Sequence, residues 1–255
     1  MLRDDLLHHK ISGNKFRKLA FWLLKYRDGN FKSITSMGGS FSNHLHALAF
    51  VCHSLKIPAK FYLPQPLAQN SETLNDIKNW GIEIEEIGRE KFRELRDKTE
   101  SDNTKDLWIP EGGKSFDNDN TFPLFTNEIK IKTLWVSAGT GSTAIALKKA
   151  GFPVKALLAV KDVSVKELLE SHDIETFPSY ELAKFGKCNT EMAETAADFF
   201  NQTKILVDPI YNAKSILYLS QNSLLKDCDC LYHCGGLQGW RGYQDLYNQY
   251  FINIK

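Results

Sequence analysis

The sequence predicts an α/β protein in which open, twisted, mainly parallel sheets are flanked by helices. Short apolar segments of strand length alternate along the chain with segments of helical period, an alternation that is typical of parallel sheets. Several of the strand-like segments run directly into glycine-rich turns that open a helix. With 255 residues, of which 42% are hydrophobic, the chain is long enough for one large domain or for two smaller domains around a single cleft.

Charge and cysteine content argue against several classes of function. The 32 basic and 31 acidic residues give a net charge of +1, which leaves no electrostatic footprint for nucleic acid or an anionic membrane, so we expect small partners. The five cysteines form no C-x-x-C pair, and His44, His46 and His53 are not grouped closely enough on a helix face to chelate, so we expect neither disulfides nor a metal. No apolar run approaches the ~20 residues of a membrane span and no signal peptide is recognisable, so we expect a cytoplasmic protein.

The first predicted helix begins with an unusually placed lysine. Residues 12–14 are Ser-Gly-Asn, which favour a turn and a helix N-cap, and apolar residues recur at helical spacing over 16–24, so Lys15 should lie in the first turn. The helix dipole favours acids in that turn by about 0.3–1 kcal/mol, so Lys15, Arg17 and Lys18 together suit an anion or a carbonyl compound. From this stretch alone, a solvated basic helix face is the more ordinary explanation.

The first half of the chain then alternates strands with helices. A strand at 32–37 runs into the turn Gly-Gly-Ser-Phe-Ser-Asn at 38–43, and a helix follows at 45–55. Such a turn lets the backbone approach a carboxylate or phosphate, although Ser42 and Asn43 are also common helix caps. The next predicted elements are, in order, strand 59–63, helix 71–80, strand 82–87, a charged helix at 91–100, a loop at 102–106 and a strand at 107–109 leading into the turn 110–113. The change of composition at 107–113 is the expected domain boundary.

A second glycine turn follows the strand predicted at 133–138. The run Gly-Thr-Gly-Ser-Thr-Ala at 139–144 fits the dinucleotide-binding pattern G-x-G-x-x-G/A. Asp162 follows a strand predicted at 154–160 and lies about 20 residues after this run, where a ribose-binding acid is expected. The hydroxyls of the same run suit a terminal phosphate monoester, which needs many donors. This turn alone leaves both interpretations open.

The last third adds two polar positions at predicted strand ends. Its elements are, in order, a strand at 203–207, the motif Asp-Pro-Ile-Tyr-Asn-Ala-Lys at 208–214, a helix at 215–225, a strand at 231–234, the run Gly-Gly-Leu-Gln-Gly at 235–239 and a helix at 243–251. Ligands collect at the carboxyl ends of the strands in an open α/β sheet, so Tyr211 and Cys234 are candidate site residues.

Four separate elements suit a cofactor that carries a carbonyl and a phosphate. They are Lys15 in its turn, Ser42 and Asn43 at a helix start, the turn at 139–143 and Tyr211. Pyridoxal phosphate needs a lysine for a Schiff base, a nest of N–H and hydroxyl groups for its phosphate, and donors near its ring. A nicotinamide cofactor would explain only the turn at 139–143.

The ordered motifs resemble those of the 1-aminocyclopropane-1-carboxylate deaminase / D-cysteine desulfhydrase family, which are pyridoxal-phosphate enzymes of the tryptophan synthase β-subunit type. The motifs, covering nearly the whole chain, are Ser-Gly-Asn-Lys-Phe-Arg-Lys-Leu, Gly-Gly-Ser-Phe-Ser-Asn-His, Pro-Glu-Gly-Gly, Gly-Thr-Gly-Ser-Thr, Asp-Pro-Ile-Tyr-Asn-Ala-Lys and His-Cys-Gly-Gly-Leu-Gln-Gly. The resemblance implies two α/β domains with the cofactor in the cleft between them, a larger one from 1–18 and 113–255 and a smaller one from 19–112. It also implies a homodimer and a small amino-acid substrate.

The resemblance also implies a role for each site residue. Lys15 would form the Schiff base and move the α-proton of the substrate, with Ser42 and Tyr211 as further catalytic residues. The cofactor would be bound by Lys15, Lys18, Asn43, Gly139, Thr140, Gly141, Ser142, Thr143 and Cys234. The substrate would be bound by Ser42, Asn43, His44 and Tyr211.

Three residues and the start of the chain depart from the family pattern. Asn212 stands where the deaminases have glutamate, Cys234 where they have leucine, and Phe185 where they have a second active-site tyrosine. The segment that normally precedes Arg3 is missing. Because neither Asn212 nor Cys234 is an acid that keeps the cofactor ring nitrogen protonated, we expect elimination from D-cysteine to be preferred over opening of 1-aminocyclopropane-1-carboxylate. The alternatives are the deaminase activity, a catalytically weak paralogue that binds the cofactor, and a nicotinamide-dependent oxidoreductase.

Overall fold

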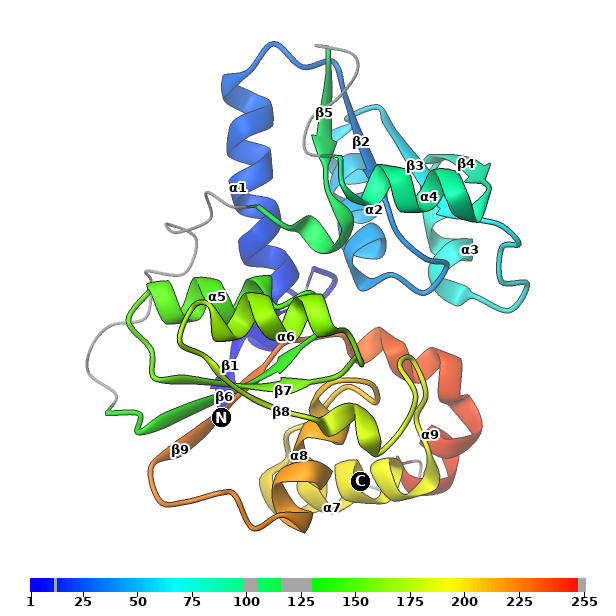
Figure 1. Ribbon diagram of the computed structural model, residues 1–255. Helices are drawn as coiled ribbons and strands as arrows, with labels where there is room; N and C mark the ends of the chain where they lie inside the picture. The colour runs from blue at the N-terminus through cyan, green and yellow to red at the C-terminus, as the bar shows by residue number, and fades with distance from the viewer. Residues whose placement is uncertain (12, 99–104, 116–129, 252–255) are drawn as a thin grey trace. The chain divides into compact units, whose positions relative to one another are not determined.

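A computed structural model describes residues 1–11, 13–98, 105–115 and 130–251 of the chain (Figure 1). The chain separates into two compact units, one formed by Met1–Leu6 with Asp119–Lys255 and the other by Leu7–Asn118. These bounds differ from the predicted domain division at residues 7–18 and 113–118. The difference at 7–18 has a simple cause, since α1 (Asn14–Asp28) runs across residue 18 as one continuous helix.

The Leu7–Asn118 unit contains a four-stranded sheet in the order β4-β3-β2-β5. Its strands are β2 (Ser33–Met37), β3 (Ala59–Pro64), β4 (Glu83–Ile87) and β5 (Asp106–Ile109). Every pairing is parallel, with Ile34 opposite Ala59 in β3 and opposite Leu107 in β5. The strand-helix alternation of the sequence therefore predicted this sheet correctly.

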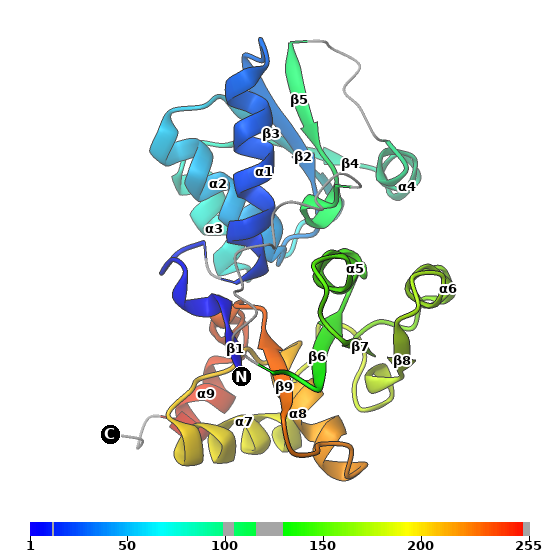
Figure 2. The same cartoon turned by 90° about the vertical axis from the view of Figure 1, so that its left-hand side faces the viewer.

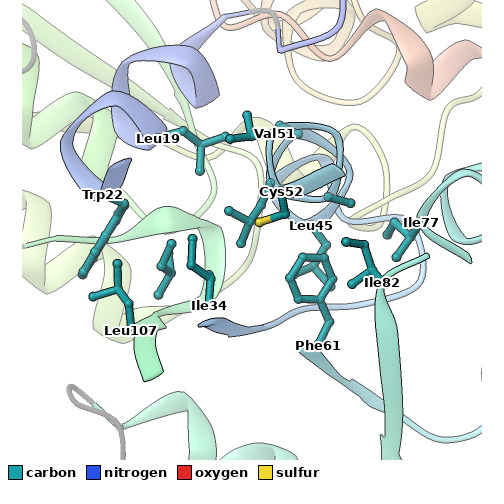
Figure 3. Packing of buried hydrophobic residues seen from close by; sticks show 14 of the residues in the cluster. Leu19, Trp22, Ile34, Leu45, Val51, Cys52, Phe61, Ile77, Ile82 and Leu107 are labelled. Atoms are coloured by element: carbon teal, nitrogen blue, oxygen red, sulfur yellow. The ribbon is translucent and has the colours of Figure 1, made fainter. Parts of the chain in front are cut away.

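Helices cover both faces of this sheet (Figure 2). On one face lie α1, α2 (Asn43–Leu55) and α3 (Glu72–Asn79), and on the other lies α4 (Arg89–Arg96). Strand side chains alternate between the two faces, so Ile34, Phe61 and Leu107 pack under α1 and α2 (Figure 3), while Trp108 packs with α4. This packing fixes the start of α1 next to the carboxyl ends of the strands.

The other unit contains a five-stranded parallel sheet in the order β1-β9-β6-β7-β8. Its strands are β1 (Leu2–Arg3), β6 (Thr133–Ala138), β7 (Val154–Leu158), β8 (Glu175–Phe177) and β9 (Asp229–His233). The helices are α5 (Ser142–Lys149), α6 (Val163–Glu170), α7 (Thr190–Thr203), α8 (Asn212–Gln221) and α9 (Gln244–Phe251). The helices α5 and α6 pack on one sheet face, and α8 packs on the other (Figure 1).

One predicted strand is wrong. Residues 203–207 form no strand, because α7 continues to Thr203 and Lys204 then ends the helix with a positive φ of 60°. Val207 and its neighbours pack instead among α7, α8 and α9. The edge of β9 that such a strand would need is paired with β1, an element too short to be recognised in the sequence.

The other predicted elements are present, with ends shifted by a few residues. Additional elements that were not predicted are β1, β8, α6 and α7. Ser12, the end of the helix predicted at 91–100 and most of the loop predicted at 102–106 lie outside the described residues. Among the described residues, no helix combines the length and the apolarity that a membrane crossing requires.

Candidate functional site

In the Leu7–Asn118 unit, Lys15 and Lys18 converge on one backbone carbonyl. The Nζ atoms of both lysines lie 3.4 Å from the carbonyl oxygen of Gly112, in the turn that follows β5. The helix α1 begins as the sequence predicts, with Gly13 as its N-cap at a φ of 73°, a conformation that favours glycine. Two ammonium groups at one oxygen repel each other, so the arrangement suits an anionic or carbonyl ligand.

His44 is buried beside the two lysines and is fixed as a neutral ring. Its Nε2 lies 2.9 Å from Ser36 Oγ, which in turn lies 2.7 Å from the carbonyl oxygen of Ile109. Because a carbonyl only accepts, the Ser36 hydroxyl donates to Ile109 and accepts from the Nε2–H of His44, which leaves a lone pair on Nδ1. Burial first, and then the charges of Lys15 and Lys18, hold the pKa of His44 well below its usual value.

The Nδ1 atom of His44 has no hydrogen-bond partner among the described residues. A Cβ added to Gly113 would lie 3.3 Å from this atom, and Gly113 has a positive φ of 70°, so the turn after β5 brings its backbone against the histidine ring. Lys15, Lys18, His44, Gly112 and Gly113 together form what we call the lysine cluster. Its chemical character is that of two amines and one hydrogen-bond acceptor.

Ser42 and Asn43 open the helix α2 in the same unit. The Oγ atom of Ser42 accepts a hydrogen bond from the backbone N–H of Leu45 at 3.2 Å, so Ser42 is the N-cap. Both residues are half-buried. The Ser42 hydroxyl keeps its own proton for donation, which makes the cap compatible with a second role.

In the other unit, the turn after β6 forms the start of α5. Gly141 is the N-cap with a φ of 78°, and the hydroxyls of Thr140 and Ser142 lie 3.1 Å apart. A Cβ added to Gly139 would lie 3.4 Å from the phenol oxygen of Tyr211, so this glycine lets the tyrosine pack onto the turn. The name glycine turn is used for residues 139–143. Backbone N–H groups at a helix start, together with hydroxyl groups, suit a phosphate.

Tyr211 is held in place by a buried carboxylate. Asp208 is 1% exposed, and its two oxygens accept the backbone N–H groups of Ile210, Tyr211 and Asn212 at 3.1, 2.7 and 2.9 Å. Burial raises the pKa of Asp208, while these N–H groups and the nearby His233 act in the opposite direction. Asp208 was not predicted as a site residue, although an Asp-Pro pair at the start of a turn is a usable signal for it.

Asn212 and Cys234 contact each other across the space between α8 and β9. The side-chain nitrogen of Asn212 donates to the carbonyl oxygen of Tyr232 at 3.0 Å, and the Cys234 thiol donates to the side-chain oxygen of Asn212 at 2.9 Å. The Cys234 sulfur also lies 3.7 Å from Asp208. Asp208 is therefore an acid close to Cys234, a neighbour that was not predicted from the sequence. The oxygens of Asp208, however, already accept the three N–H groups of its own turn.

Asp162 does not behave as a free ribose-binding acid. Its carboxylate caps α6, accepting the backbone N–H groups of Ser164 and Val165 at 3.0 and 3.4 Å and the Ser164 hydroxyl at 2.7 Å. The interpretation of the glycine turn as a dinucleotide-binding site required Asp162 to bind a ribose, and this carboxylate is used as a helix cap instead. No three His, Cys, Asp or Glu side chains of the described ranges come together as a metal site.

No protein-family model matches the chain. The chain is 24% identical to a protein of Pyrococcus horikoshii named, provisionally, as a 1-aminocyclopropane-1-carboxylate deaminase, over 95% of this chain and 86% of that protein. It is 23% identical to the bifunctional D-cysteine desulfhydrase/1-aminocyclopropane-1-carboxylate deaminase, mitochondrial, of Arabidopsis thaliana, over 93% of this chain and 72% of that protein.

Solved structures share the fold. The structure described as an ACC deaminase homologue superimposes with a TM-score of 0.76 at 22% identity, covering 95% of this chain and 86% of that chain. A pyridoxal 5'-phosphate-dependent aspartate racemase gives a TM-score of 0.59 at 12% identity, covering 88% and 80% of the two chains. The resemblance to the 1-aminocyclopropane-1-carboxylate deaminase / D-cysteine desulfhydrase family, predicted from the motifs, is thus confirmed over nearly the whole chain.

Proposed function

We propose that this protein is a pyridoxal-phosphate-dependent lyase or deaminase that acts on a small amino acid. The observation that carries the proposal is the placement of Lys15, whose amine meets that of Lys18 at Gly112 O, at the start of a helix and beside the turn that follows β5. The names of the relatives over nearly the full chain support the same chemistry. When bound, pyridoxal phosphate would withdraw electrons from the α-carbon of the amino acid.

We assign the phosphate of this cofactor to residues of one unit and its carbonyl carbon to a lysine of the other. The glycine turn offers N–H groups and the hydroxyls of Thr140, Ser142 and Thr143, with glycine at 139 and 141 where the backbone needs it, and we assign it to the phosphate. The amine of Lys15 would hold the carbonyl carbon. Lys18, Asn43 and Cys234 complete the proposed cofactor contacts.

The proton transfer belongs to Lys15. Its amine would take the α-proton of the substrate as a general base, and the amine of Lys18 lies beside it at the same carbonyl oxygen. Ser42, Asn43, His44 and Tyr211 would surround the substrate. The lone pair on Nδ1 of His44 suits a donor group such as an amine or a thiol.

We place D-cysteine first among the substrates, with water as the co-reactant and pyruvate, ammonia and hydrogen sulfide as products. The thiolate leaves with the electron pair of the carbon–sulfur bond, so this reaction makes a smaller demand on the cofactor ring than opening a cyclopropane does. Asn212 and Cys234 carry no carboxylate that could keep a ring nitrogen protonated. The two carboxylate oxygens of Asp208 already accept backbone N–H groups of their own turn. The cyclopropane substrate is the second candidate, supported by the names of both relatives.

A substrate panel tests the proposal. The purified protein, supplied with pyridoxal phosphate, should release 2-oxo acid and ammonia from D-cysteine faster than from L-cysteine or 1-aminocyclopropane-1-carboxylate. A higher kcat/KM for 2-oxobutanoate release from the cyclopropane would make the deaminase the correct assignment. If the protein binds the cofactor and releases nothing from any D- or L-amino acid, the weak-paralogue alternative, which Phe185 and Cys234 favour, replaces both.

The remaining parts of the proposal concern assembly and location. We propose a homodimer, on the resemblance alone, and sedimentation at equilibrium would test it. We also propose a cytoplasmic location, supported by five cysteines that are all free. Fractionation of the source cells would test the location.

A further inference from the structure

Lys214 is a fully buried lysine in the first turn of α8. Its side chain has 0% exposure, and its ammonium donates a hydrogen bond to the carbonyl oxygen of Ala183 at 2.9 Å. An apolar side chain of the same length would fill this space without a buried amine, so packing alone does not account for a lysine here. The contact with Ala183 is what a lysine adds.

Ala183 belongs to a short connection between Ser179–Glu181 and α7 that is held from two sides. Lys214 holds the carbonyl of Ala183, and the Tyr243 hydroxyl donates to the carbonyl of Gly186. The N–H of Lys187, directly after Gly186, bonds to the carbonyl of Lys184 at 3.1 Å and closes a turn. The name tethered segment is used for residues 183–186.

The tethered segment presents Phe185 to Tyr211. Phe185 is 54% exposed, and its ring lies 6.2 Å from that of Tyr211 at an interplanar angle of 65°, an edge-to-face contact. Tyr211 and Lys214 are three residues apart at the start of α8, so one helix turn supplies both the ring that Phe185 touches and the amine that holds the segment. The hydrogen bond from Lys214 and the ring contact of Tyr211 therefore both join the tethered segment to the same end of α8.

We propose that Lys214 is a positioning residue that, with Tyr243, holds the tethered segment so that Phe185 forms an apolar wall beside Tyr211. We further propose that this wall selects amino acids with small uncharged side chains, such as a thiol or a methyl group, over acidic ones. A carboxylate brought against the Phe185 ring would lose water without gaining a donor. The selectivity part rests on the proposed function, in which Tyr211 faces the substrate, whereas the tether does not.

Limited trypsin digestion tests the tether without any activity assay. Lys184 and Lys187 are exposed trypsin sites within or next to the segment. Cleavage at such sites is controlled by local opening, so Lys214→Met should be cut there about tenfold faster than the wild type, identified by peptide mass. Tyr243→Phe, which removes one hydroxyl, should be cut faster by a smaller factor and serves if Lys214→Met fails to fold.

The matched control is Lys166→Met, which removes an exposed lysine paired with Glu170 on α6. It should be cut at the wild-type rate. If both Lys214→Met and Tyr243→Phe are also cut at the wild-type rate, the tether does not hold the segment and the proposal is overturned.

Substrate selectivity tests the wall. In Lys214→Met, the ratio of kcat/KM for D-cysteine to that for D-aspartate should fall about tenfold, mainly through a lower KM for D-aspartate. An unchanged ratio with faster cleavage overturns the wall and leaves the tether. If the wild type itself consumes no amino acid while Lys214→Met is still cut faster, the proposed function is overturned and the tether stands. The two failures are therefore distinguishable.

Discussion

The lysine cluster and the glycine turn lie at equivalent positions in two parallel sheets but offer a ligand different chemical groups. Both lie just beyond the carboxyl ends of parallel strands, where the sheets of α/β proteins collect ligands. The lysine cluster brings two amines to one carbonyl oxygen and buries a neutral histidine beside them. The glycine turn has no charged side chain at all, only backbone N–H groups, hydroxyls and a tyrosine packed on Gly139.

The difference indicates a division of labour. Groups that change protonation state need an environment that shifts their pKa, and in the lysine cluster burial and the charges of the two lysines lower the pKa of His44. A phosphate stays ionised and needs only a rigid set of donors, which glycine and hydroxyl residues provide. Variants of the lysine cluster should therefore lose chemistry, and variants of the glycine turn should lose cofactor affinity.

The largest effect is expected at Lys15. Lys15→Ala should lower kcat by about 10³-fold or more, because it removes both the covalent attachment and the base. It should also abolish the chromophore that borohydride reduces in a Schiff-base enzyme, measured by absorbance. The control is Lys10→Ala, an exposed lysine of the same unit that should behave as wild type. A reducible chromophore in Lys15→Ala would show that another lysine holds the cofactor.

At the glycine turn, the double variant Thr140→Ala/Ser142→Ala should bind the cofactor about 10²-fold or more weakly, since each of the two hydrogen bonds to a charged phosphate contributes about 1.5–3 kcal/mol. Cofactor titration by fluorescence measures this affinity, and Tm in the absence of cofactor should match the wild type. Thr195→Ala, on an exposed part of α7, is the control. Unchanged affinity would remove the phosphate from this turn.

Gly141 is a poor position at which to test phosphate binding. A substitution such as Gly141→Asp adds a charge at the turn, but the residue has a φ of 78°, and a new Cβ would lie 3.3 Å from the side chain of Leu169. The variant would strain the backbone and crowd the core of its own unit as well as repel a phosphate. We therefore expect loss of stability together with loss of cofactor, measured by Tm, so the hydroxyl variants separate the two effects better.

The buried histidine gives a pH dependence of stability with a defined sign. The folded state holds the pKa of His44 well below the unfolded value of 6.5, so the unfolded chain binds more protons between the two values. The free energy of unfolding should fall as the pH drops below about 6.5, by at most about 1.4 kcal/mol per pH unit for this one group. His44→Gln should show a smaller slope in urea denaturation between pH 4.5 and 7.

His53→Gln serves as the control for that slope, because His53 is an exposed histidine of the same helix. Its slope should equal that of the wild type. Equal slopes in His44→Gln and the wild type would contradict the neutral, buried state of His44.

Much of the fold could be predicted because local pattern and tertiary structure agree. The alternation of strand and helix, and glycines at strand ends, predicted the four-stranded sheet, three of the five strands of the other sheet, the starts of α1 and α5, and the position of Lys15. The failures share a physical cause. Residues 203–207 have strand-like composition, yet their burial is against helices, and local composition does not say which surface an apolar segment meets.

The candidate site could be predicted only in part for a similar reason. Gly112 contributes a carbonyl that meets Lys15, Ser36 forms a hydrogen bond with His44, and Asp208 accepts three N–H groups of its turn. Each of these roles depends on a partner residue that only the folded structure brings near. Asp162 shows the converse, since its spacing fitted a ribose-binding acid while its carboxylate caps the helix that begins next to it. Motif order identified the resemblance, but long-range contacts are needed to identify the supporting residues.

The smallest effect is expected at Cys234, where the variant is Cys234→Thr. The thiol is a weak donor, and it already contacts the side-chain oxygen of Asn212 at 2.9 Å, so a hydroxyl in its place can keep this contact and donate more strongly. We expect kcat/KM for D-cysteine to be unchanged or raised by up to about tenfold, the range of one ordinary hydrogen bond. The measurement is pyruvate release by Cys234→Thr and, as control, by Cys230→Thr on the adjacent strand β9. A loss of activity in Cys234→Thr but not in Cys230→Thr would mean that the sulfur of Cys234 itself is required. Cys234 would then be a third reactive group, in addition to the lysine cluster and the glycine turn.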